Sequence, residues 1–228
     1  MFEKISRLWK GDAPLRKQYG QFAKMMDLDR ALYRRVVEAM NKGGDLTSLE
    51  ETVYRGDIEI NKLERRIRKQ IVTHLALNPG VEVTSCLILM SIVKDAERLG
   101  DLCKNLYESS ICWGRPVSEL KFAAKINELQ LYVSETFDYT IKAFEEEDDV
   151  LAGEIIRDEV LWNKRFDSFL NELAGSDVPT REAVSTTLFV RNFKRLQAHL
   201  SNIASSVVMP LHQIDHRPVH LRTSKDHD

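Results

Sequence analysis

Two acidic residues, Glu97 and Asp101, are the part of this sequence best suited to chemistry. They begin and end the segment Glu97-Arg98-Leu99-Gly100-Asp101, so a helix places their carboxylates one turn apart. Asp57 lies one turn before Asn61 on another predicted helix, and antiparallel packing of the two helices would bring these acidic flanks together. Carboxylates converging from two helices suit hard cations. The spacing would therefore allow a divalent or ferric metal ion held by Asp57, Glu97 and Asp101, without distinguishing Fe, Mn, Mg or Zn.

From the residues alone, the preferred interpretation is that the same acids are ordinary solvated helix residues. In a heptad assignment of their helix, the core positions a and d are occupied by Leu89, Ile92, Ala96, Leu99, Cys103 and Leu106. Glu97 and Asp101 then fall at the flanking positions b and f. The assignment predicts that both carboxylates face outward, whether or not a metal binds.

The elements that must position these residues are long helices. Clusters of Gly, Pro, Asn and Asp interrupt apolar patterns of helical spacing, and no window shows the alternation typical of strands. The predicted helices cover residues 14–42, 46–77, 81–110, 117–147, 149–174 and 178–209. The fold class predicted is all-α, with six long antiparallel helices.

The second half of the chain repeats features of the first. The segment from Arg55 to Lys62 shares an Arg, an acid, an Asn and a Lys with the segment from Arg157 to Lys164, about a hundred residues later. Two repeated three-helix bundles follow from this. The predicted organisation is a lead segment at 1–12, a first repeat at 13–112, a second, partly degenerate repeat at 117–210, and a flexible tail at 211–228.

The second repeat lacks the acidic pair. Lys194 occupies the position that matches Glu97, and Ala198 the position that matches Asp101. Glu159 remains, and beside Lys194 it is interpreted as a surface acid in a salt bridge. We therefore expect at most one metal cluster, in the first repeat.

The motif from Glu97 to Asp101, followed by Asn105, resembles the signature helix of the PhoU family of phosphate-signalling proteins. Asp57 to Asn61 is similar to the family's first acidic turn, and the resemblance extends over six helices in two repeats. It implies metal binding in surface clusters and a link between phosphate uptake and phosphate-responsive transcription. Phosphate transporter components and a membrane sensor histidine kinase are the partners it implies.

Charge and hydropathy argue against nucleic-acid binding and against a membrane span. A formal charge of -2 gives no broad basic footprint for nucleic acid, and no apolar run approaches the ~20 residues of a membrane span. These features predict a cytoplasmic protein that meets a membrane only through partners. Its oligomeric state is left open. His212, His216 and His220 have metal-ligand spacing, but Pro218 interrupts a helix there, so a solvated tail is the preferred interpretation.

The function predicted is that of a non-enzymatic, PhoU-like regulator of phosphate uptake and signalling. Two alternatives stay open. One is a metal-dependent hydrolase of phosphorylated compounds, in which a bound ion lowers the pKa of water. The other is a helical scaffold of the same fold that binds no metal, which the Lys194 and Ala198 replacements favour.

Overall fold

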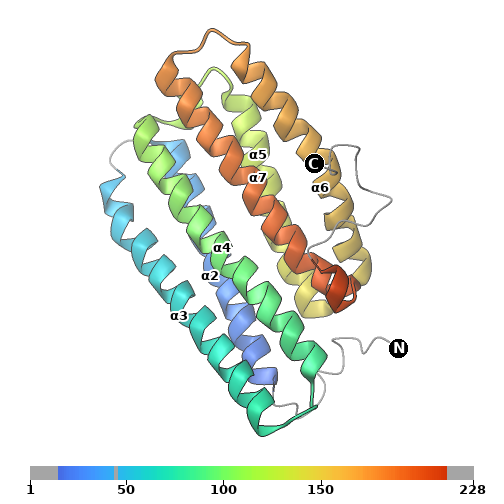
Figure 1. Ribbon diagram of the computed structural model, residues 1–228. Helices are drawn as coiled ribbons and strands as arrows, with labels where there is room; N and C mark the ends of the chain where they lie inside the picture. The colour runs from blue at the N-terminus through green and yellow to red at the C-terminus, as the bar shows by residue number, and fades with distance from the viewer. Residues whose placement is uncertain (1–14, 44–45, 215–228) are drawn as a thin grey trace.

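The computed structural model describes residues 15–43 and 46–214, and within these ranges six α-helices account for almost all of the chain (Figure 1). They are α2 (Arg16–Lys42), α3 (Thr47–Leu77), α4 (Val83–Trp113), α5 (Ala123–Glu146), α6 (Asp149–Ala174) and α7 (Thr180–Val208). No strand occurs in the described residues. The all-α prediction is confirmed. The helix boundaries differ from the predicted ones by up to three residues, except that α5 begins only at Ala123, because Val117–Glu119 forms a short 3-10 turn.

The predicted apolar seams form the core. The six a and d residues of α4 are fully buried: Leu89, Ile92, Ala96, Leu99, Cys103 and Leu106. On α3 the corresponding residues Val53, Ile60 and Ile67 are buried as well. Alternating steps of three and four residues keep each seam on one side of its helix, which suits packing of nearly parallel axes.

Helices α4 and α7 lie side by side and antiparallel in the middle of the bundle (Figure 1). Asp95 of α4 accepts hydrogen bonds from His199 at 2.7 Å and Asn202 at 3.0 Å on α7. Farther along, Asn192 of α7 donates to Ser109 of α4. Helix α3 packs on α2 and α4, α6 packs on α5 and α7, and α2 also contacts α5.

Gly100 allows α3 to approach α4 closely beside the acidic motif. A Cβ atom at this position would lie 2.9 Å from Cδ1 of Ile60 and 3.1 Å from Oδ1 of Asp29. A larger residue here would therefore force the side chains of Ile60 and Asp29 to shift.

The lead segment at 1–12 lies outside the described residues, and so do His216 and His220 of the tail. His212 falls in a second 3-10 turn, Leu211–Gln213. None of the described helices is long and apolar enough to cross a membrane.

Replacing the fully buried Leu99 by Asp should unfold or loosen the bundle, because an unpaired carboxylate in the core costs roughly 3 kcal/mol or more. The control is Leu161→Asp on α6, where the leucine is 59% exposed and the change should cost little. Urea denaturation of both variants checks this. Similar free energies of unfolding would show that the α4 seam is assigned wrongly.

Candidate acidic site between α3 and α4

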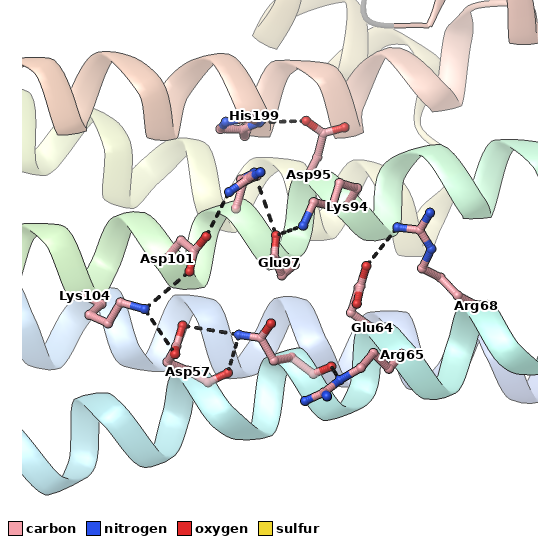
Figure 2. A network of polar contacts seen from close by, with 12 residues as sticks. Asp57, Glu64, Arg65, Arg68, Lys94, Asp95, Glu97, Asp101, Lys104 and His199 are labelled. Atoms are coloured by element: carbon pink, nitrogen blue, oxygen red, sulfur yellow. Dashed lines mark hydrogen bonds and ion pairs between the residues drawn. The ribbon is translucent and has the colours of Figure 1, made fainter.

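The structure brings Asp57 and Asp101 together through a lysine. Lys104 Nζ lies 3.2 Å from Asp57 Oδ2 and 3.4 Å from Asp101 Oδ1 (Figure 2). Burial acts to lower the pKa of Lys104, but the two carboxylates outweigh it and the pKa is raised. Lys104 therefore stays charged and links α3 to α4 at the point where their acidic flanks were predicted to meet.

Glu97 is held by two other basic residues. Its Oε2 atom lies 2.6 Å from Lys94 Nζ and 3.8 Å from Arg98 Nε. Arg98 also binds Asp101, at 3.1 Å. Every carboxylate of the predicted metal site thus has a cationic partner from α4 itself.

The outward orientation predicted for Glu97 is wrong, because this residue is only 7% exposed. The heptad assignment treated α4 as a helix with one partner, whereas α4 packs against α2, α3 and α7. Positions beside the seam are therefore covered too. The side chains of Asp57 and Asp101 are 14% and 26% exposed, and both are partly buried.

A fourth carboxylate, that of Asp29 on α2, lies beneath this site and was missed from the sequence. It is fully buried, and neither of its oxygens has a hydrogen-bond partner among the described residues. Burial raises the pKa of Asp29 well above its usual value, and the charges of Glu97 and Asp57 raise it further. The sequence could have indicated this residue, because Asp29 lies at helical spacing among the apolar residues of α2, and a core position seldom holds an acid.

The second repeat keeps part of the local pattern. Asn61 donates to both the backbone and the side chain of Asp57, and Asn163 donates to Glu159 Oε1 at 3.2 Å. The interpretation of Glu159 as a surface acid is wrong. Glu159 is 6% exposed, and Lys194 binds Asp167, at 2.6 Å.

As they are arranged here, the acids do not form an open metal site. In the described part of the chain, no three His, Cys, Asp or Glu side chains are positioned to hold one ion. The oxygen donors suit a hard cation, but Lys94, Arg98 and Lys104 occupy them. A metal would have to displace these basic side chains.

A groove of about 850 Å³ runs along the outer side of α2 and α3. Ile58 is the exposed apolar residue of its lining, and Leu32 and Leu63 lie buried at its base. The lining also contains five basic and two acidic residues: Lys24, Arg35, Arg55, Lys62, Arg66, Glu51 and Glu59. The two acids pair with Lys24 and Arg55. Arg35, Lys62 and Arg66 form no ion pair with the described residues, so the groove carries an excess of positive charge.

Comparisons with protein-family models, related sequences and solved structures all identify PhoU proteins as similar to this chain. The model of the PhoU domain matches the chain twice, at residues 22–110 and 126–207. A phosphate-specific transport system accessory protein PhoU homolog from Aquifex aeolicus is 30% identical over 138 residues. That alignment covers 60% of this chain and 61% of the relative.

Two solved structures share the fold. The crystal structure of PhoU from Pseudomonas aeruginosa superposes with a TM-score of 0.76 at 20% identity, covering 86% of this chain and 95% of that one. The phosphate transport system regulatory protein PhoU from Streptococcus pneumoniae gives 0.73 at 16% identity, covering 85% and 93%.

The buried Asp29 predicts a specific dependence of stability on pH. Its raised pKa means that the folded chain holds the proton more tightly than the unfolded chain, in which Asp titrates near ~3.9. Above about pH 4, a rising pH therefore favours unfolding until the pH passes the folded pKa. Asp29 should therefore lower the stability of wild-type protein as pH rises, and the Asp29→Asn variant should lack this contribution. In chelator-treated protein, the free energy of unfolding of Asp29→Asn minus that of wild type should increase with pH.

Urea denaturation at several pH values measures this gain. The control is Asp27→Asn on the same helix, where the side chain is 52% exposed and the curve should follow wild type. If the free energies of unfolding of Asp29→Asn and wild type changed with pH in parallel, the assignment of a neutral, buried acid would be contradicted.

Proposed function

The chain belongs to the PhoU family, and we propose that it regulates phosphate transport and phosphate-responsive signalling through contacts with other proteins. The observation that carries this proposal is the match of the PhoU domain to both halves of the chain. The printed name of the Aquifex relative, an accessory protein of a phosphate-specific transport system, supports it. Components of a phosphate transporter and a membrane sensor histidine kinase are the partners we propose.

We propose the groove between α2 and α3 as the docking face for a transporter component. Arg35, Lys62 and Arg66 supply unpaired positive charge, and Ile58, which is 49% exposed, supplies apolar area. An acidic helix or loop of the partner is the occupant that complements this surface. Long-range attraction between opposite charges would also speed the encounter.

We also propose that Asp57, Glu97 and Asp101 take up a divalent or ferric ion by exchanging their basic partners for the metal. The oxygen donors support this, and the ion pairs oppose it, because Lys104 and Arg98 already neutralise the carboxylates. The metal would act by holding α3 and α4 together at this surface.

The docking proposal predicts that reversing the charge at Arg35, Lys62 and Arg66 to Glu abolishes regulation without unfolding the chain. The assay is a phosphate-starvation reporter in a strain that lacks the gene. Wild-type protein should restore repression in phosphate-rich medium, and the triple variant should not.

The matched control reverses Arg157, Lys164 and Arg181, three exposed basic residues on α6 and α7 without described ion pairs. This variant should restore repression. Equal loss of repression in both triple variants would reject the groove, and no effect of wild-type protein on the reporter would reject the function.

The metal proposal predicts competition between Lys104 and the ion. Removing the lysine charge with Lys104→Gln should raise occupancy by Mn or Fe, and the double variant Glu97→Gln, Asp101→Asn should abolish it. Elemental analysis after dialysis measures both, and circular dichroism confirms that the helices remain. Metal retained by the double variant would refute the ligands, and no metal in any variant would favour the scaffold alternative.

A further inference from the structure

We propose that a cleft between α4 and α7 binds a tetrahedral oxyanion of the phosphate class. The cleft has a volume of about 500 Å³. It is lined by Asn105, Glu108 and Ser109 of α4 and by Leu188, Arg191, Asn192 and Arg195 of α7. It shares no residue with the acidic site or with the docking groove, so this proposal can be tested independently of the proposed function.

Two arginines supply the charge. Arg191 and Arg195 lie one helical turn apart, and both side chains are exposed at the cleft. Neither forms an ion pair or a hydrogen bond with another described side chain. Because guanidinium groups bind oxyanions with two parallel hydrogen bonds, a pair at this spacing can hold one phosphate between them.

The first repeat shows why Arg195 lacks a partner. Residues of α4 and α7 correspond at an offset of 97, which relates Arg98 to Arg195 and Asn105 to Asn202. Arg98 is neutralised by Asp101 at 3.1 Å. The residue that corresponds to Asp101 is Ala198, so Arg195 has lost its acid while keeping its charge.

A second acid is missing at the same place. Asp95 of α4 accepts hydrogen bonds from His199 and Asn202. Its counterpart on α7 is Asn192, which faces Asn105 and Ser109 across the cleft. Asn192 is 7% exposed and donates to Ser109 Oγ at 3.4 Å. At the corresponding contact, α7 thus places an amide where α4 has a carboxylate, and Leu102 of α4 stands where α7 has His199.

An external anion can supply the missing negative charge. The amide of Asn105 can donate to its oxygens beside the arginines. Ser109 instead stabilises the cleft wall, because its hydroxyl donates to the backbone oxygen of Asn105 at 2.6 Å. The cleft also exceeds several-fold the ~30 Å³ that one water molecule occupies in the liquid. Glu108 is the acid of this lining, and its Oε1 atom accepts from Tyr54 of α3 at 3.0 Å.

Isothermal titration calorimetry of the purified chain with inorganic phosphate in chloride buffer tests the site by measuring stoichiometry and affinity. We expect one ion per chain. Arg195→Gln should weaken binding about tenfold or more, because it removes a charge-assisted contact. Ala198→Asp should weaken it similarly, by giving Arg195 the partner that Arg98 has. Ala198→Asn and the exposed Arg157→Gln of α6 are the controls and should bind like wild type.

A parallel titration with phosphoserine identifies the source of the anion. Tighter binding of phosphoserine assigns the site to a phosphorylated compound, and tighter binding of inorganic phosphate assigns it to the free ion. Thermal melting shows whether each variant is folded. The site is overturned if neither ligand binds saturably, if Arg157→Gln weakens binding as much as Arg195→Gln, or if folded Ala198→Asn and Ala198→Asp are equally impaired.

Discussion

The antiparallel packing of α4 against α7 is the constraint on which the rest of the bundle depends. Both helices contact partners within their own half as well as each other, so little of either surface remains for charged groups. Polar residues at the contact must then be paired, because burying an unpaired charge costs several kcal/mol. Asp95 meets this requirement through His199 and Asn202. Asn192 meets it by being neutral.

The same requirement explains the state of the acidic motif. Glu97 is 7% exposed on a helix that packs against three others, and its charge is tolerated because Lys94 and Arg98 reach it from the same helix. Lys104 does the same for two acids on different helices. The carboxylates are therefore a candidate metal site, and through Lys104 they also hold α3 against α4.

The helices and their seams could be predicted from sequence, because apolar spacing and turn residues act locally. The Lys194 and Ala198 replacements were also visible, since they require only alignment of the two halves. Burial of Glu97 and Asp29 could not be predicted, because it depends on how many helices surround each position. The role of Lys104 was missed for a related reason: a residue three positions after Asp101 became a bridge only once α3 was placed beside α4.

The connectivity of the bundle has a consequence for folding kinetics. Helices within each half are neighbours in sequence and meet through short turns, so their contacts close small loops. The hydrogen bond between Asp95 and His199 instead joins residues 104 positions apart. Closing the larger loop costs more chain entropy, and such contacts form later on average. The helical hairpins should therefore assemble first, with the docking of α4 on α7 as the step that sets the folding rate.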